Sequence, residues 1–236
     1  MMLCIIGNND ISLKLKDAAA AGGLEAQVID SVDAFSGTAD MVILNTEGDL
    51  PTRQAQVAAL AKKTAAPIAG RISLDYACAL TKETEAKGQV VAIRTMEDLH
   101  IGEYIELTRT FDTDDAVYAK ALEILKAFNG YVAEVPDVIG GIFYRTCFLY
   151  SNMGAFLVSE GVTVVDVDNS IQYGNNIKFP PMRIADEIGL DRMLEILTVL
   201  YQETGRPAYR PCPLIKQLVN AGRVGKKCGQ GFYKYD

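Results

Sequence analysis

The 236-residue sequence contains a single histidine, no tryptophan and only five cysteines. The cysteines are scattered and form no C-x-x-C pair; they are Cys4, Cys78, Cys147, Cys212 and Cys228. Because one histidine leaves no set of ligands at metal spacing, we expect no metal site. An odd number of scattered cysteines indicates reduced thiols, and therefore a cytoplasmic protein rather than one held together by disulfides.

The sequence also lacks long apolar runs and an excess of positive charge. No run reaches the ~18 to 20 residues of a membrane span, and the first ten residues have neither the basic flank nor the long apolar stretch of a signal peptide. The formal net charge of −7 argues against a nucleic-acid binder, which needs clustered lysine and arginine. Hydrophobic residues make up 49% of the chain, enough to form a core. We therefore expect a globular protein that binds neither nucleic acid nor a membrane.

Strand-like and helix-like stretches alternate in the first half of the chain. Apolar runs predict strands at 2–7, 26–31, 40–46, 66–70, 89–95, 103–110 and 131–138. Helical spacing of apolar residues predicts helices at 11–21, 52–63 and 113–129, the last with Thr113 as its cap. Such alternation is typical of an α/β domain with a parallel sheet.

The pattern changes after Pro136, where alternating β-branched runs stop. Helices are predicted at 140–160, 166–176, 183–204 and 212–221, separated by glycine and proline. We therefore expect an α/β domain over residues 1–136 and an all-α domain over 137–236.

Three segments of the second half contain distinctive sequence motifs. Residues 179–191 read FPPMRIADEIGLD, residues 211–222 read PCPLIKQLVNAG, and residues 222–236 read GRVGKKCGQGFYKYD. Together they resemble the C-terminal helical domain of 3-hydroxyacyl-CoA dehydrogenases, and residues 137–162 resemble the linker and first long helix of that domain. The resemblance is specific from about residue 90 to the end and fainter before it.

The resemblance implies a fold and a set of partners. It implies a Rossmann-like domain that binds NAD in the family, then a helical domain that dimerises, with the acyl-CoA held between the two. Between Asp30 and the next strand, only residues 31–39 stand where the family has a helical pair that contacts CoA. At 1.5 Å per residue this segment is too short for two helices. The first domain is therefore expected to be a reduced, truncated Rossmann-like domain.

The residues that would bind NAD are only partly present. Gly7 follows the first strand, but Asn9 and Ser12 stand where the G-x-G-x-x-G fingerprint has its second and third glycines. A side chain at position 9 would crowd the pyrophosphate. Asp30, after the second strand, matches the acidic residue that holds the ribose hydroxyls, although a turn residue at a strand end is an equally simple interpretation. We expect that NAD is not bound.

The catalytic set of the family, a serine, a histidine paired with a glutamate, and an asparagine, is degenerate here. Glu106 matches the glutamate, but the histidine position holds Arg94, which cannot act as a base because it stays protonated. Arg94 and Glu106 either form an ion pair or are unrelated strand residues. Ser73 is the weak match to the serine and Tyr144 replaces the asparagine. His100 is either a displaced base or, more simply, a surface residue.

Two functions follow from the resemblance. In the first, the chain is a non-catalytic copy of a 3-hydroxybutyryl-CoA dehydrogenase from fatty-acid or aromatic-acid β-oxidation. It would form a homodimer, or a pseudo-dimer with a homologous copy, through residues 137–204. The apolar residues of the first long helix predict that interface; they are Ile142, Phe143, Cys147, Phe148, Met153, Phe156 and Leu157. In the second, the chain is an active NAD-dependent dehydrogenase with a rebuilt site of Glu106, Tyr144 and Ser73.

Overall fold

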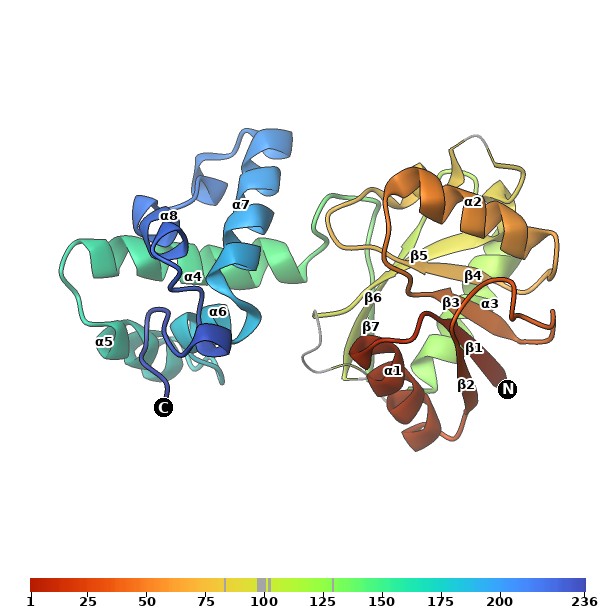
Figure 1. Ribbon diagram of the computed structural model, residues 1–236, viewed down its shortest axis with the longest axis horizontal. Coiled ribbons are helices and arrows are strands. Elements are labelled where there is room, and N and C mark those ends of the chain that lie inside the picture. The colour runs from red at the N-terminus through yellow and green to blue at the C-terminus, as the bar shows by residue number, and fades with distance from the viewer. Residues whose placement is uncertain (83, 97–100, 102, 129) are drawn as a thin grey trace. The chain divides into compact units, whose positions relative to one another are not determined.

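The computed structural model describes residues 1–82, 84–96, 101, 103–128 and 130–236. The chain divides into two compact parts, an N-terminal unit of Met1–Gly141 and a C-terminal unit of Ile142–Asp236 (Figure 1). The sequence placed this boundary five residues earlier, between 136 and 137. Each unit is described separately below.

A seven-stranded sheet forms the centre of the N-terminal unit. Its strands are β1 (Met2–Ile6), β2 (Glu25–Ile29), β3 (Met41–Leu44), β4 (Ile68–Arg71), β5 (Val90–Arg94), β6 (Tyr104–Arg109) and β7 (Tyr131–Glu134). The order across the sheet is β2-β1-β3-β4-β5-β6-β7, and β2 and β7 are its two edges. Neighbouring strands are parallel except β5 and β6, which are antiparallel. The sheet is therefore mixed, whereas the sequence predicted a parallel sheet.

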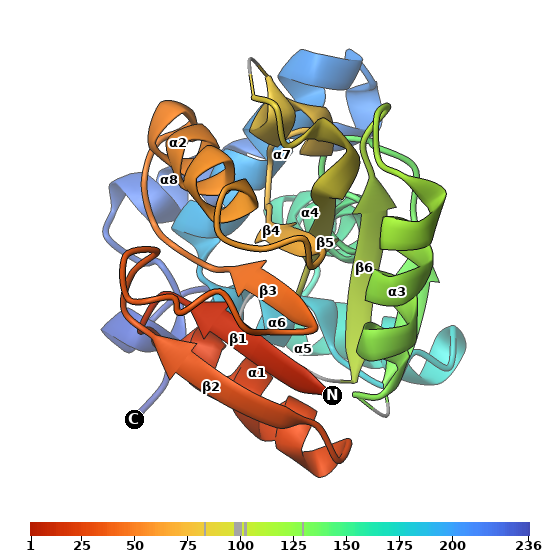
Figure 2. The same ribbon diagram turned by 90° about the vertical axis from the view of Figure 1, so that its right-hand side faces the viewer.

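Helices cover both faces of this sheet (Figure 2). Side chains alternate between the faces along a strand, so Leu3 and Ile5 pack with α1 (Asp10–Ala21) and α3 (Asp115–Lys126). Cys4 and Ile6 face the opposite core, with α2 (Leu50–Ala61) and the short 3-10 helix η1 (Ala77–Thr81). Burial of both strand faces explains why the strands read as continuous apolar runs.

The connection from β2 to β3 contains no helix, as its length predicted. Two residues of this segment, Val32 and Phe35, are buried. The Lys63 ammonium group donates hydrogen bonds to the carbonyl oxygens of Val32, at 2.9 Å, and Asp33, at 3.3 Å. These contacts fix the short connection against the sheet.

One helix of the N-terminal unit begins differently from the prediction. The cap position of α3 is Asp114, not Thr113. The Thr113 hydroxyl instead donates to the Val90 carbonyl oxygen at 2.6 Å and accepts from the Thr110 N–H at 2.8 Å. Thr113 therefore attaches the loop before α3 to the start of β5.

The C-terminal unit is helical. It contains α4 (Phe143–Ser159), α5 (Val164–Asn169), a π-helical turn (Ser170–Gly174), α6 (Pro181–Ile188), α7 (Leu190–Thr204) and α8 (Pro213–Asn220). The single helix predicted at 183–204 is wrong, because Gly189, with φ of 108°, divides it into α6 and α7. That backbone conformation is readily adopted only by glycine.

The prediction of an apolar surface on the first long helix, α4, is partly wrong. Cys147 and Phe148 are buried in the unit's own core. Ile142, Met153, Phe156 and Leu157 are exposed, and Tyr150 joins them. All five cysteines are free, and none of the helices in the described ranges is long and apolar enough to span a membrane.

Candidate functional site

The turn from β1 to α1 lies at the carboxyl end of the parallel strands, where ligands bind in sheets of this type. Gly7 has φ of 116°, and a β-carbon there would overlap the carbonyl group of Asn45, the residue after β3. Glycine is therefore required at position 7 by the close approach of two chain segments. This requirement exists whether or not a nucleotide binds.

Asn9 closes the N-terminus of α1 with its own side chain. Its Oδ1 accepts hydrogen bonds from the Ser12 N–H, at 3.0 Å, and from the side-chain amide of Asn45, at 2.8 Å. Its Nδ2 donates to the Asn45 carbonyl oxygen at 3.2 Å. The Asn45 amide also donates to the Ser12 hydroxyl at 2.8 Å, and both of these side chains are buried. These three side chains, which we call the amide cluster, satisfy a helix N–H group that would otherwise face a phosphate.

A cavity of about 370 Å³ adjoins the amide cluster. Its lining residues are Gly7, Asn8, Asn9, Asp30, Asn45, Thr46, Glu47 and Gln56. Gly7 and Asp30, predicted from the sequence as remnants of a cofactor site, are thus brought to the same cavity. The lining contains the carboxylates of Asp30 and Glu47 and no lysine or arginine. A diphosphate there would meet the Glu47 carboxylate and a helix N–H group that is already bonded to Asn9, which makes these residues a poor fit for the pyrophosphate of NAD.

A second polar group lies where β5 and β6 pair. Arg94, the last residue of β5, stands directly opposite Glu106 of β6 in the antiparallel register. Both residues are almost wholly buried, with 3% and 1% of their surface exposed. A β-carbon at Gly141 would overlap Glu106 Oε2 and lie 3.2 Å from Arg94 Cδ, so both side chains converge at Gly141.

The Arg94 guanidinium is held by acceptors from three segments. Nη2 donates to the carbonyl oxygens of Asp75, at 3.1 Å, and Val138, at 3.0 Å. Nη1 donates to the Thr108 hydroxyl at 3.2 Å, and Nε to the Ser73 carbonyl oxygen at 3.4 Å. These bonds tie β5 to β6, to the loop after β4 and to the segment after β7. Arg94 is thus a structural connection within the N-terminal unit.

The other predicted catalytic residues lie in different elements of the fold. Ser73 is half-buried in the loop after β4 and meets Arg94 through its backbone carbonyl. Glu106 Oε1 accepts a hydrogen bond from the Tyr104 hydroxyl at 3.1 Å, and burial, followed by the charge of Glu106, raises the pKa of that phenol. Tyr144 belongs to the C-terminal unit, where its buried ring stacks on Phe148. His100 lies outside the described residues.

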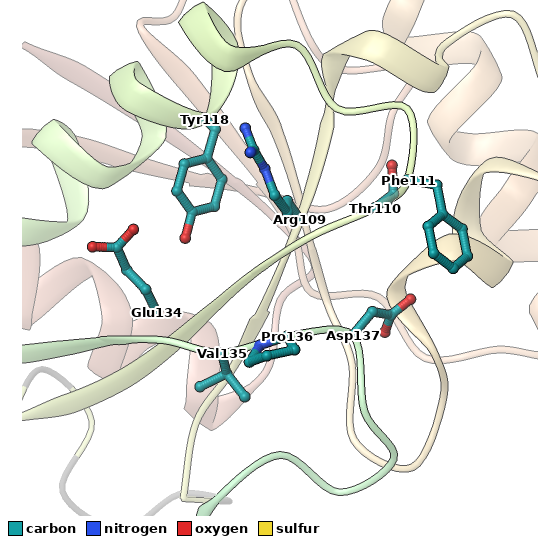
Figure 3. A pocket seen from close by; sticks show the side chains of 8 residues that line it. All are labelled: Arg109, Thr110, Phe111, Tyr118, Glu134, Val135, Pro136 and Asp137. Carbon is teal, nitrogen blue, oxygen red and sulfur yellow. The ribbon is translucent and has the colours of Figure 1, made fainter.

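A larger hollow, of about 550 Å³, lies beside the ends of β6 and β7 (Figure 3). Arg109 lies over the Tyr118 ring, 4.6 Å from its centre, and its Nη2 is 2.6 Å from the carboxylate of Asp115. Burial, followed by hydrogen bonding to Glu134, raises the pKa of Tyr118 to about 12. The Asp137 carboxylate accepts the N–H groups of Ala77 and Cys78. Because these groups serve local structure, we assign this hollow no catalytic role.

Two of the three motifs that carry the resemblance meet at one buried carboxylate of the C-terminal unit. Asp186, fully buried in α6, accepts the N–H groups of Phe232 and Tyr233, at 2.9 and 2.8 Å, and the Tyr235 hydroxyl at 3.0 Å. Burial raises the pKa of Asp186, and the three donors partly offset this rise. A β-carbon at Gly231 would overlap the same carboxylate. Asp186 of the first motif (179–191) therefore anchors the glycine- and aromatic-rich last motif (222–236).

Comparison with known proteins identifies the family of the helical unit. Residues 140–235 match the family model of the 3-hydroxyacyl-CoA dehydrogenase C-terminal domain. Residues 140–235 belong to the 3-hydroxyacyl-CoA dehydrogenase family. It is 32% identical over 157 residues to a 3-hydroxybutyryl-CoA dehydrogenase of Bradyrhizobium diazoefficiens, an alignment that covers 66% of this chain and 54% of the relative. A probable 3-hydroxybutyryl-CoA dehydrogenase of Bacillus subtilis is 31% identical over 154 residues, covering 65% and 54%.

A solved structure extends the likeness to the whole fold. The (S)-3-hydroxybutyryl-CoA dehydrogenase of Ralstonia eutropha superposes with a TM-score of 0.86 at 20% identity and covers 100% of this chain and 99% of that one. At this identity the likeness concerns the fold. The chain spans about half the length of the relatives it matches in sequence. The Rossmann-like unit and the helical unit predicted from the sequence are therefore both present.

Sequence reasoning missed the most informative residue of this family member's site. Asn45 was included in a predicted strand, yet its amide connects Asn9 to Ser12. The available signal was a polar residue at the carboxyl end of a buried parallel strand, the sheet edge where ligands bind. Thr108 and Val138, which help to hold Arg94, gave no such signal.

Proposed function

We propose that this chain is a non-catalytic copy of the 3-hydroxyacyl-CoA dehydrogenase fold, which pairs with a second, homologous copy. One observation carries the proposal. Arg94, at the position where the resemblance places the catalytic histidine, donates four hydrogen bonds to structural acceptors. A guanidinium stays protonated at any working pH, so it cannot take a proton from a substrate hydroxyl.

The cofactor site supports the same proposal. The family's chemistry is transfer of hydride to a nicotinamide, for which the dinucleotide must be held by its pyrophosphate. Asn9 of the amide cluster bonds one N–H group of the helix N-terminus, and Glu47 adds a negative charge beside Asp30 in the same cavity. The chain's own residues therefore act against the cofactor at the point where the fold normally binds it.

The partner follows from the C-terminal unit. On α4, the exposed side chains Tyr150, Met153, Phe156 and Leu157 recur at intervals of three and four residues and so share one face of the helix. We name these four residues the α4 face. A contiguous exposed apolar face is typical of an interaction surface. We propose that the α4 face pairs with another copy of the helical domain, either in this chain or in a competent homologue.

A second function rests on Glu106. This carboxylate is retained and buried, and it contacts the Tyr104 hydroxyl at 3.1 Å. An active NAD-dependent enzyme with a rebuilt site would use Glu106 as its base, with Ser73 or Tyr144 binding the substrate. The two functions differ in whether Glu106 is needed for turnover or only for folding.

The deciding experiment is an assay of the purified chain with 3-hydroxybutyryl-CoA and NAD, which follows NADH at 340 nm. An active dehydrogenase of the family serves as positive control. The proposal predicts no turnover by the chain alone, and none after Arg94→His, because the cofactor turn remains closed. Turnover at ordinary enzyme rates that disappears in Glu106→Ala would establish the rebuilt site instead.

A further inference from the structure

The strand order leaves β2 as an uncovered edge of the sheet. In the doubly wound order 3-2-1-4-5-6, the third strand lies beside the second and covers it. Here β3 follows β2 through the short connection and pairs with β1 instead. In the described part of the N-terminal unit, no strand lies beyond β2, and Figure 2 shows it as the outermost strand. Shortening of the chain between β2 and β3 has thus placed the second strand at the edge.

Two backbone hydrogen bonds at the ends of β2 show which backbone groups face outward. The Glu25 N–H donates to the Met1 carbonyl oxygen at 3.1 Å, and the Ile29 carbonyl oxygen accepts from the Gly7 N–H at 2.9 Å. In a parallel ladder, residues with groups toward a given neighbour alternate along the strand. Residues 25, 27 and 29 therefore face β1, and Ala26 and Val28 direct their N–H and C=O groups away from the sheet.

Among the described residues, β2 has few of the features that protect an edge strand. Natural edge strands are blunted by lysine, proline, bulges or a covering segment. The sequence of β2 is EAQVI, with one charged residue, at its first position. The pairing with β1 is regular over all five residues, and Ala26 to Ile29 are each half-buried. Ala26 and Val28 pack at the border of the core beneath α1, so an added strand would extend that core.

We propose that β2 pairs antiparallel with β2 of a second copy of this chain, about a two-fold axis at Gln27. In this register Ala26 of each copy lies opposite Val28 of the other copy. Both are outward-facing residues, so each pair exchanges two backbone hydrogen bonds. Two-fold symmetry joins the same surface of both copies, and the edge is complementary to itself in this arrangement.

The side chains fit the same register. Opposite residues of an antiparallel pair share a face of the sheet, so Ala26 and Val28 of both copies meet on the α1 face. Glu25 lies opposite Ile29, and Gln27 opposite Gln27, so no two like charges face each other across the pair. This self-complementarity favours a second copy over an unrelated strand.

Disulfide trapping tests the register. Gln27→Cys is made in full-length protein in which Cys4, Cys78 and Cys228 are replaced by alanine or serine, because Cys4 is the neighbour of Gln27 on β1. Opposite residues that exchange no hydrogen bonds have Cα atoms ~4.5 Å apart, within the range of a disulfide. The matched control is Glu25→Cys. In the proposed register the two copies of position 25 are offset by four residues along the strand, which is about 13 Å at ~3.3 Å per residue.

We expect mild oxidation to form a Gln27→Cys disulfide dimer at least about tenfold faster than the Glu25→Cys dimer, since only the former has disulfide geometry. Adding Val28→Pro should abolish this advantage, because proline removes an outward N–H group while an edge strand tolerates it. Circular dichroism checks that the variant is folded. The advantage should persist in Phe156→Glu, which disrupts the α4 face and not β2.

Three results would overturn the proposal. The first is equal oxidation rates for Gln27→Cys and Glu25→Cys. The second is an advantage that survives Val28→Pro in folded protein. The third is slowed hydrogen exchange of the Ala26 and Val28 amides that appears only when a different protein is added, which would assign the edge to another partner.

Discussion

Arg94 and Glu106 occupy directly opposite positions of the antiparallel pair β5–β6, and both are buried. Where the family resemblance expects an imidazole and its carboxylate partner, this chain has a cation and a carboxylate that meet at Gly141. Strand register places the two positions together whichever residues occupy them. The same geometry that could orient a catalytic base here holds a permanently charged group between structural acceptors.

The first prediction concerns the stability that Arg94 provides. Arg94→Met should lower the free energy of unfolding by about 3 to 5 kcal/mol, because it leaves the Glu106 carboxylate and several carbonyl groups buried without the guanidinium. Urea denaturation followed by circular dichroism measures the loss. Arg109→Met is the control: its ion pair with Asp115 is exposed, and the expected loss is about 1 kcal/mol or less. Equal losses would show that Arg94 has no special structural role.

The second prediction concerns the anchor of the C-terminal tail. Asp186→Ala removes the acceptor of two backbone N–H groups and one hydroxyl, and should destabilise the protein by about 2 to 4 kcal/mol. Limited proteolysis should then cleave after Lys226 or Lys227 earlier than in the unaltered protein. Asp191→Ala breaks only an exposed pair with Lys227 and should change stability by about 1 kcal/mol or less. A tail that stays resistant in Asp186→Ala would contradict the anchor.

The third prediction concerns the thiols and pH. Burial raises the pKa of Cys147 to about 12, so almost no thiolate forms at pH 8. Hydrogen bonds with the backbone, that of Gln230 first, lower the pKa of the exposed Cys228. Iodoacetamide at pH 8 should therefore label Cys228 and leave Cys147 unlabelled, as peptide mass spectrometry can show. Because the folded pKa of Cys147 lies above its ordinary value of 9.0, the neutral thiol favours the folded state, and stability should fall as pH rises above that value.

The fourth prediction concerns the α4 face. Phe156→Glu places a charge among exposed apolar residues and should weaken self-association, or association with a homologous copy, by at least about tenfold. Sedimentation velocity measures the effect, with Val28→Pro present in every protein compared so that pairing through β2 does not contribute. Glu160→Gln, on the same helix end but outside the apolar set, should leave association unchanged. Unaltered association in Phe156→Glu would exclude the α4 face as the interface.

The elements predicted best from the sequence are those whose burial is uniform. Residues 2–7 and 40–46 are continuous apolar runs, and both form strands that are buried on two faces. The parallel direction predicted for the strands is wrong between β5 and β6, since nothing in EYIELTRT indicates that β6 runs antiparallel to β5. Tertiary pairing sets that direction. Gly189 was likewise read as part of a helix, because its φ of 108° has no signature in the helical spacing around it.

The candidate site was predicted less completely than the fold. Gly7, Asp30, Arg94 and Glu106 could be found by their match to family positions. Asn45 had only a general signal, a polar residue at the end of a buried strand, because its bonds to Asn9 and Ser12 depend on the distance between β3 and the start of α1, which only the folded sheet sets. The hydrogen bonds of Arg94 go to residues 14 to 44 positions away along the chain, Val138 being the most distant, and for the same reason had no local signal.

Calorimetric titration of the purified chain with NADH tests the central claim most directly, because it does not require knowledge of the acyl substrate. Because Asn9 bonds a helix N–H group at the start of α1 and Glu47 adds negative charge to the cavity, we predict no saturable binding in the micromolar range. An active dehydrogenase of the family, titrated in the same buffer, confirms that the assay detects binding. Stoichiometric, micromolar binding of NADH to this chain would contradict the account and favour a working dehydrogenase.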